Sequence, residues 1–219
     1  MHMKIAVVNE TSAGHRNPDV MKALETALAG QGHTIINAGM KQQGGDPELS
    51  YIETGFLAAL LLNTGRADFI VGSCGTGQGF VNVALQYPGV FCGLITEPTD
   101  AFLFARINGG NCISLPLNKG YGWAGDVNLQ FIFEKLFTAG SGAGYPESRV
   151  EAQAKSRELL KEMSTQTHLP FKDILNSMDQ GVLARTLTFP GVWEILDVDT
   201  LEDEQLKAIL TEKYNNAKA

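Results

Sequence analysis

Residues 67–80 read ADFIVGSCGTGQGF, an apolar run followed by a cysteine and three alternating glycines. Residues 69–71 are fully apolar, which is typical of a short strand buried in a parallel sheet. Cys74 then opens a glycine-rich turn, and the apolar spacing after Phe80 predicts a helix. We interpret this stretch as a strand, a turn and the start of a helix, and the rest of the chain as organised around it.

The turn after Cys74 is a candidate site because of the backbone that it exposes. The first amides of a helix have no acceptor within the helix, and the helix dipole points its positive end towards them. Such amides bind anions, and Gly75, Gly77 and Gly79 leave them uncovered. The same surroundings favour a thiolate, which predicts that Cys74 is a base or nucleophile. The alternative is a small buried cysteine in a tight turn.

The composition predicts one globular core. The chain has 219 residues, of which 44% are hydrophobic and 19% are charged, enough for a single well-packed domain. Its net charge of −7 argues against nucleic acid or an anionic membrane surface as a partner, because both require a basic face. A local cradle of amides still allows an anionic substrate.

The lack of a recognised targeting signal and the spacing of the cysteines together predict a cytoplasmic protein. No apolar run is long enough to span a bilayer, and we recognise no signal peptide before the first strand. The cysteines at positions 74, 92 and 112 form no CxxC pair. We therefore expect a reducing compartment, no disulfide framework and no metal site.

Alternating strand and helix patterns in residues 1–150 predict an α/β domain. Strands alternating with helices at these intervals form right-handed crossovers, which give a five-stranded parallel sheet covered on both faces. Ligands bind outside the carboxyl ends of such strands, so the loops after Val8, Ser73, Thr96 and Leu115 are expected to converge on one cleft. The predicted strands are residues 4–8, 33–37, 69–71, 91–95 and 111–115. The predicted helices span residues 48–63, 99–107 and 126–137, and two further helices begin near Asn17 and Phe80.

Residues 151–219 read as a separate, mostly helical extension. Helices are predicted over residues 147–165 and 169–178, and Asp199 with Thr200 is expected to cap an acidic final helix. Residues 186–195 are apolar and resemble a strand. Because the extension lacks the strand–helix rhythm, we expect it to pack on the core or, preferentially, on a neighbouring subunit.

Five motifs from Lys4 to about Glu151 resemble the ribose-5-phosphate isomerase B / galactose-6-phosphate isomerase family. They are KIAVV (4–8), GSCGTGQG (72–79), YPGV (87–90), INGGN (107–111) and SRVEA (148–152). The resemblance implies a three-layer α/β/α sandwich of the Rossmann or flavodoxin type. It also implies a homodimer or higher oligomer with sites at the subunit interface, and no metal or redox cofactor. The implied reaction interconverts aldose and ketose phosphates through a cis-enediolate.

The resemblance also implies roles for individual residues. Cys74 corresponds to the proton-abstracting cysteine of the family, and Thr76 to a residue that assists ring opening. The amides from Gly75 to Gly79, including that of Gly77, correspond to the cradle of the enediolate oxygen. Elementary chemistry agrees, because a thiolate takes a proton beside a carbonyl and oriented donors stabilise the resulting oxyanion. The remaining implied substrate-binding residues are Asn108, Asn111 and Arg149.

Several positions depart from the family pattern. The ring-opening histidine corresponds to Ile107, and two arginines that bind phosphate or lie nearby correspond to Tyr145 and Phe91. The base and the oxyanion cradle therefore remain, whereas ring opening and the phosphate contacts are largely missing. Further departures are Asn9, Glu10 and Thr11 in place of an Asp-His pair, and Leu85-Gln86 in place of an Asn-Lys pair.

Two residues in the loop after the first strand offer replacements for the missing groups. If His15 and Arg16 turn inward, Arg16 binds the anion and His15 opens the ring. If they are solvated, the site should favour an unphosphorylated or singly charged sugar, since one arginine compensates a buried phosphate poorly. We favour the inward arrangement slightly. Glu10 is expected to bind sugar hydroxyls, the alternative being a surface carboxylate.

Aromatic residues in a later loop have two interpretations. Tyr121 and Trp123, together with Lys119, lie on a loop aimed at the cleft, where an aromatic ring can stack on a sugar. Packing of these rings against the extension is an equal alternative. Cys92 and Cys112 lie within strands and are interpreted as core residues.

The sequence thus favours a sugar isomerase. The expected substrate is a pentose or hexose, with a phosphorylated sugar preferred. One alternative is a catalytically silent sugar-binding module on the same fold. Another is a thiol acyl transferase, which would require a histidine beside Cys74.

Overall fold

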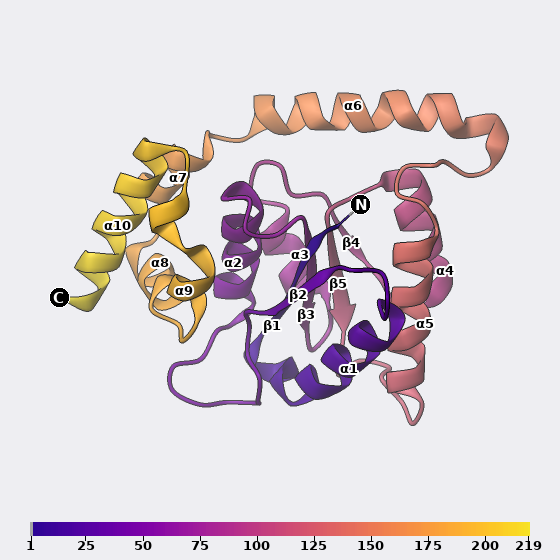
Figure 1. The fold of residues 1–219 in the computed structure, drawn as a ribbon, viewed down its shortest axis with the longest axis horizontal. Helices are drawn as coiled ribbons and strands as arrows, with labels where there is room; N and C mark the ends of the chain where they lie inside the picture. The colour runs from indigo at the N-terminus through magenta and orange to yellow at the C-terminus, as the bar shows by residue number, and fades with distance from the viewer. Residues whose placement is uncertain (1) are drawn as a thin grey trace.

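The computed structural model describes residues 2–219, and its centre is a five-stranded parallel sheet (Figure 1). The strands lie in the order β2-β1-β3-β5-β4, and each neighbouring pair is parallel. The predicted α/β architecture is confirmed, and β4 forms one edge. The strands are β1 (Lys4–Asn9), β2 (Thr34–Asn37), β3 (Phe69–Cys74), β4 (Cys92–Leu94) and β5 (Cys112–Pro116).

Helices cover both faces of the sheet, as the sandwich requires. Side chains alternate along β1, so Ile5 and Val7 join one core cluster while Ala6 and Val8 join the other. The first cluster packs against α1, α4 and α5, and the second against α2 and α3. These helices are α1 (Asn17–Ala27), α2 (Tyr51–Asn63), α3 (Gln78–Ala84), α4 (Pro98–Leu103) and α5 (Gly125–Thr138).

The central strand β3 explains why the glycine turn lies where it does. All six of its residues are buried, and the strand extends beyond the predicted apolar run to Cys74. A Cβ atom at Gly72 would lie only 2.0 Å from Cζ of Phe80. Gly72 therefore allows α3 to return flat over the strand, which holds the intervening turn at the carboxyl edge of the sheet.

The extension is helical throughout, which corrects the strand-like interpretation of residues 186–195. Those residues form the end of α8 and most of α9, separated by Pro190 and by Gly191 with φ 88°. The apolar residues of this stretch form the buried faces of two short helices, not one face of an extended strand. The helices are α6 (Val150–Thr167), α7 (Phe171–Ser177), α8 (Gln180–Leu187), α9 (Val192–Leu196) and α10 (Glu204–Lys218).

The last helix begins later than predicted. Asp203 caps it, because its side chain accepts a hydrogen bond from the amide of Leu206 at 3.0 Å. Asp199 and Thr200 instead lie in a 3-10 turn, η4 (Val198–Thr200). None of the helices in residues 2–219 combines the length and the apolar character needed to cross a bilayer.

Helices α7 to α10 pack on α2 of their own chain (Figure 1). This corrects the expectation that the apolar tail is covered by a neighbouring subunit. The guanidinium of Arg66 strengthens the contact by donating to the carbonyl oxygens of Leu196 at 2.6 Å and Asp197 at 2.8 Å. Buried extension residues in the same cluster as α2 are Phe171, Leu175, Leu183, Leu187, Val192, Leu196, Val198, Leu201, Leu206 and Leu210.

An ion pair also joins the extension to α2. Both Nε and Nη2 of Arg185 donate to Oε1 of Glu53, at 2.8 and 2.6 Å, and the Glu53 side chain is only 5% exposed. Burial by itself raises the pKa of Glu53. Hydrogen bonds from the Ser50 hydroxyl, from Arg185 and from the backbone outweigh that effect, so the pKa lies below its ordinary value.

Replacing Glu53 with glutamine is expected to cost about 1–2 kcal/mol of stability at pH 7, because a charge-assisted contact becomes neutral. A lowered folded-state pKa means that the stabilisation is present above the unfolded value of about 4.3 and is lost as the pH falls through the folded value. Urea unfolding of both proteins between pH 3 and pH 8 measures this. A difference that stays constant down to pH 3 contradicts the assignment.

Candidate active site

Cys74 ends the central strand at the carboxyl edge of the sheet and is 4% exposed. Its carbonyl accepts a hydrogen bond from the amide of Leu117 at 3.1 Å, and its Sγ lies 4.0 Å from Oγ1 of Thr76. The other thiols lie opposite each other on β4 and β5, as the core interpretation of Cys92 and Cys112 requires. Burial and the neighbouring Cys92 thiol raise the pKa of Cys112, so it stays protonated.

Glu10 occupies part of the expected amide cradle. Its carboxylate is 4% exposed and accepts hydrogen bonds from the amide of Gly75 at 3.1 Å, the amide of Ser12 at 2.9 Å and the Ser12 hydroxyl. It is therefore not a surface carboxylate, and the Gly75 amide already has an acceptor. Among the described residues, the amides of Thr76 and Gly77 donate to no acceptor, so they are the open part of the cradle.

The remaining glycines shape the turn. Gly77 has φ 75°, and a Cβ there would meet Leu94 at 2.4 Å, so only glycine fits. A Cβ atom at Gly79 would lie 2.9 Å from Cγ of Tyr51, so the glycine lets the tyrosine ring pack against the turn. Because α3 has only seven residues, its dipole is short, and the bare amides of the turn are the candidate anion-binding groups.

His15 and Arg16 do not line a substrate cleft, which corrects the inward arrangement favoured from the sequence. They end a short 3-10 helix, η1 (Thr11–Arg16), and His15 is exposed. The Arg16 guanidinium lies 3.9 Å over the ring of Tyr121 and contacts Asp19 at 3.4 Å. Within one protomer, therefore, neither side chain lines the cleft beside the glycine turn.

Tyr121 links this 3-10 helix to the later loop. Its hydroxyl donates to Oδ2 of Asp19 at 2.7 Å. Burial, together with the hydrogen bond to the Asp19 carboxylate, raises the pKa of Tyr121, so the phenol stays neutral. Its role is thus to hold the wall of the neighbouring cleft rather than to transfer protons.

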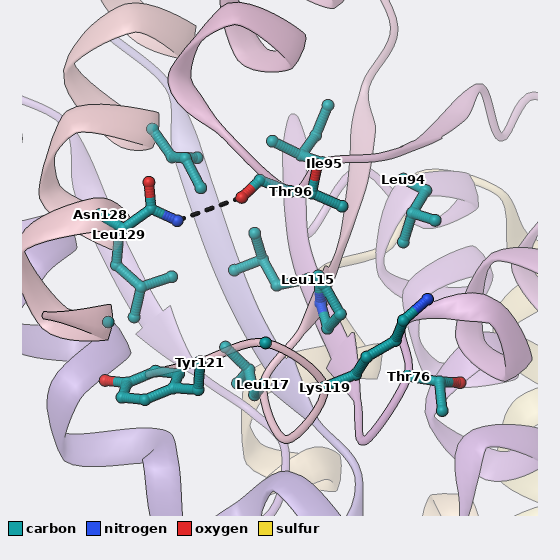
Figure 2. Close-up of a pocket in the computed structure, with 14 residues that line it drawn as sticks. Thr76, Leu94, Ile95, Thr96, Leu115, Leu117, Lys119, Tyr121, Asn128 and Leu129 are labelled. Atoms are coloured by element: carbon teal, nitrogen blue, oxygen red, sulfur yellow. Dashed lines mark hydrogen bonds between the residues drawn. The ribbon is translucent and has the colours of Figure 1, made fainter. Parts of the chain in front are cut away.

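A cleft of about 250 Å³ opens beside the turn at the carboxyl edge (Figure 2). Loops after β3, β4 and β5 line it, together with α5, whereas the loop after β1 does not. Lys119 and Tyr121 line it as expected, but Trp123 is fully exposed and contacts neither the cleft nor the extension. Its apolar floor consists of Leu94, Ile95, Leu115, Leu117, Leu129 and Ile132.

Two buried polar side chains lie behind the turn; from the sequence, Asn9 stood out only as a departure from the family pattern and Ser73 did not stand out. Asn9 and Ser73 are partners in the β1–β3 register and are both 0% exposed. The amide atoms of Asn9 and the hydroxyl of Ser73 have no hydrogen-bond partner among the described residues. The available signal was their position: each is polar and directly follows an apolar strand core.

The predicted site residues Asn108 and Asn111 lie near the amino ends of the strands, whereas Cys74 lies at the carboxyl ends. The carbonyl of Asn111 accepts from the amide of Ile70 at 2.9 Å. Cys74 follows Ile70 by four residues on β3, and a strand rises about 3.3 Å per residue. Cys74 therefore lies roughly 13 Å from Ile70 along the strand. The side chain of Asn111 is bound to the backbone of Gly89 and Phe91, at 2.8 and 2.9 Å, so it holds a loop within its own chain.

Asn108 and Arg149 lie at the same distant edge, and both are exposed. Asn108 ends a π-helical segment, η2 (Phe104–Asn108), which replaces the last part of the predicted helix over residues 99–107. Arg149 ends the 3-10 turn η3 (Glu147–Arg149) directly before α6. One protomer therefore brings together Cys74, Thr76, the glycine turn and Glu10, but not Asn108, Asn111 or Arg149.

Comparisons with known proteins identify the class of protein that combines this glycine turn with a parallel sandwich. The family model described as Ribose/Galactose Isomerase matches residues 5–140. The chain belongs to this family, and the protein is a sugar isomerase. No curated protein sequence matches it significantly.

Two solved structures match almost the entire chain. A 4-deoxy-L-threo-5-hexosulose-uronate ketol-isomerase, crystallised with a tartrate, is 34% identical with a TM-score of 0.91. A ribose-5-phosphate isomerase from Vibrio parahaemolyticus is 36% identical with a TM-score of 0.91. Each match covers 97% of this chain and 100% of the other, so both relatives include the extension.

A more distant structure shares the fold without the full length. The type B ribose 5-phosphate isomerase of Trypanosoma cruzi is 17% identical with a TM-score of 0.64. That match covers 76% of this chain but 99% of the other. The sandwich is thus common to all three structures, whereas nearly full coverage of this chain is limited to the first two.

Proposed function

We propose that the protein interconverts an aldose and a ketose by proton transfer at Cys74. The thiolate takes the proton from C2 of the aldose, and the C–H electron pair forms the C1–C2 double bond of an enediolate. Transfer of the O2 proton to O1 and return of the first proton to C1 then give the ketose, so no other reactant is consumed. The observation that carries this proposal is the position of Cys74, beside the open amides of Thr76 and Gly77, which can stabilise the enediolate oxygen.

The arrangement of cations supports a singly charged sugar in place of a sugar phosphate. Ile107, Tyr145 and Phe91 occupy positions where the family has cationic or proton-transferring groups, and Arg16 is engaged with Asp19 and Tyr121. A phosphate dianion would lose hydration without adequate compensation. A carboxylate carries half that charge, and one full-length relative is named for a uronate substrate, whereas the other is named for ribose 5-phosphate.

The distant placement of Asn108 and Arg149 supports a homodimer with shared sites. Both lie beyond reach of Cys74 in their own protomer, so they could serve a site only in a partner. β4 is the outermost strand on one side of the sheet. A two-fold axis beside β4 would place the carboxyl ends of the strands in one protomer next to the amino ends of the strands in its partner. The apolar side chains of α6 that such a partner would cover are Leu159, Leu160 and Met163, which are 46–57% exposed.

Exchange of substrate hydrogen with deuterated water tests the proposed reaction. We expect deuterium to enter C1 or C2 of a suitable sugar, with the corresponding ketose formed at a comparable rate. The panel should pair uronates with the neutral hexoses and hexose 6-phosphates of the same configuration. Tight binding without exchange across the panel would favour the silent binding module instead.

A further inference from the structure

The π-helical segment η2 ends in three consecutive carbonyl groups that need donors from elsewhere, because the last carbonyls of a helix have none within it. Two of them accept hydrogen bonds from backbone amides of the loop after α5, at 2.8 and 2.7 Å. The third, that of Ile107, accepts from Nη1 of Arg157 on α6 at 2.9 Å. Asn108 is the next residue, so this end of η2 determines where its side chain lies.

Arg157 contacts the chain on both sides of Asn108. Its guanidinium binds the carbonyl of Ile107, and a Cβ atom at Gly109 would lie 3.2 Å from Cδ of the arginine. Gly109 has φ 55°, so a glycine there lets the chain turn closely around the arginine stem. Nη2 of Arg157 also donates to the carbonyl of Gly142 at 2.7 Å. The same side chain therefore joins η2 to the loop after α5, and it lines one pocket of about 230 Å³ together with Asn108.

Arg157 differs in its contacts from a neighbouring cation of α6. Lys161 pairs with Glu158 at 2.9 Å, and both of those side chains are exposed. No carboxylate of the described residues lies within 4 Å of the Arg157 guanidinium. Its two terminal nitrogens instead bind backbone carbonyls in a planar fork, which a lysine ammonium does not reproduce. The side chain therefore braces the main chain and forms no surface ion pair.

From these contacts we infer that Arg157 is a positioning residue of the isomerase, which fixes Asn108 so that its amide group enters the active site of the partner subunit. The inference rests on the proposed shared site, in which Cys74 comes from one protomer and Asn108 with Arg149 from the other. The side chain of Asn108 is exposed and forms no hydrogen bond with the described residues. Its position therefore depends on the backbone that Arg157 holds.

Loss of this brace should act on the reaction and not on the core. Ser164 is the one buried residue in the described helix α6, so Arg157→Met opens no cavity. The carbonyl oxygens of Ile107 and Gly142 would lose their charged donor, and the end of η2 would shift. We expect kcat to fall about 100-fold, because displacing a group that positions the substrate by about 1 Å can cost that much.

Two further variants separate the fork from the charge. Isomerisation and deuterium incorporation are measured with whichever uronate, hexose or hexose 6-phosphate the unaltered protein converts fastest. Arg157→Lys keeps the charge but not the fork, so its kcat should stay at least about tenfold below the original value. Lys155→Met removes an exposed cation of the same helix and should leave kcat within about twofold. Full activity in Arg157→Met or in Arg157→Lys overturns the inference.

Mixing with a second variant shows which half of the site Arg157 serves. Under conditions that exchange subunits, an Arg157→Met protomer paired with a Cys74→Ala protomer contains one intact site, so equal amounts should restore about a quarter of the original activity. Paired with Arg149→Ala, it should restore none, because both defects then lie in the same half. The reverse pattern would mean that Arg157 acts on Cys74 of its own protomer, which contradicts the inference.

Hydrogen–deuterium exchange of the backbone amides provides a control that needs no substrate. In Arg157→Met we expect faster exchange over residues 104–111 and unchanged exchange over residues 69–80, with an unchanged mass in solution by light scattering. Faster exchange throughout, or loss of assembly, would mean that the arginine acts through the fold or the interface, and would overturn the inference. If the unaltered protein exchanges hydrogen with no sugar, the isomerase function fails and the inference fails with it. An active protein whose Arg157→Met variant is equally active contradicts the inference alone.

Discussion

Replacing Cys74 with alanine is expected to lower kcat about 1,000-fold, because general acid–base catalysis typically contributes between 10² and 10⁴. The affinity for sugar should change little, since the thiol is almost fully buried and the open amides of Thr76 and Gly77 remain. Initial rates of isomerisation and of deuterium incorporation measure the effect. Both should fall together, because both require removal of the same proton.

Cys92→Ala is the matched control. Cys92 is half-buried on the edge strand, on the same side of the sheet as Cys74 but away from the turn. Its removal should leave kcat within about twofold of the original value, as most substitutions away from a site do. Retention of full activity by Cys74→Ala, or an equal loss in Cys92→Ala, would contradict the assignment of the base.

Mixing two inactive variants tests whether the site is shared. In a homodimer with shared sites, a Cys74→Ala protomer paired with an Arg149→Ala protomer contains one intact site. Random pairing of equal amounts should then restore about a quarter of the original activity. If each protomer holds its own complete site, the mixture should stay as inactive as its components.

Replacing Leu187 with alanine is expected to give the largest loss of stability, about 3 kcal/mol, because its fully buried side chain leaves a cavity. For a chain of this size the loss corresponds to a fall in Tm of about 6–12 °C. Leu187 lies in the cluster that joins α8 to α2, so the loss should appear in the unfolding of the whole chain. Calorimetry at several protein concentrations provides the measurement.

Leu169→Ala removes the same number of atoms from a side chain that is 59% exposed, and its Tm should change by less than about 2 °C.

The dependence of Tm on protein concentration separates packing of the extension within its own chain from packing against a partner subunit. Packing of the extension within its own chain predicts that the fall in Tm caused by Leu187→Ala is independent of concentration. A fall that disappears at high concentration would indicate that a partner subunit covers Leu187.

Local patterns were sufficient to predict the sheet and the glycine turn at the carboxyl ends of its strands. Short apolar runs alternate with amphipathic segments, and such alternation has few solutions besides a covered parallel sheet. Glycines follow Cys74 at every second position, which predicted an exposed turn without any knowledge of distant contacts. The extension was harder to predict, because residues 186–195 bury one face of two short helices and their apolar content resembles that of a strand.

What the sequence by itself determined is the class of fold and the position of Cys74 and the glycine turn at the carboxyl ends of the strands. These depend on neighbours in the chain: an apolar strand, a cysteine at its end and bare amides after it. Only the tertiary structure decided the rest. It turned Arg16 onto Tyr121, placed Glu10 on the Gly75 amide and brought Lys119 to the wall of the cleft. The physical reason is that the direction of a long polar side chain depends on partners far away in sequence, such as Asp19 for Tyr121, 102 residues apart.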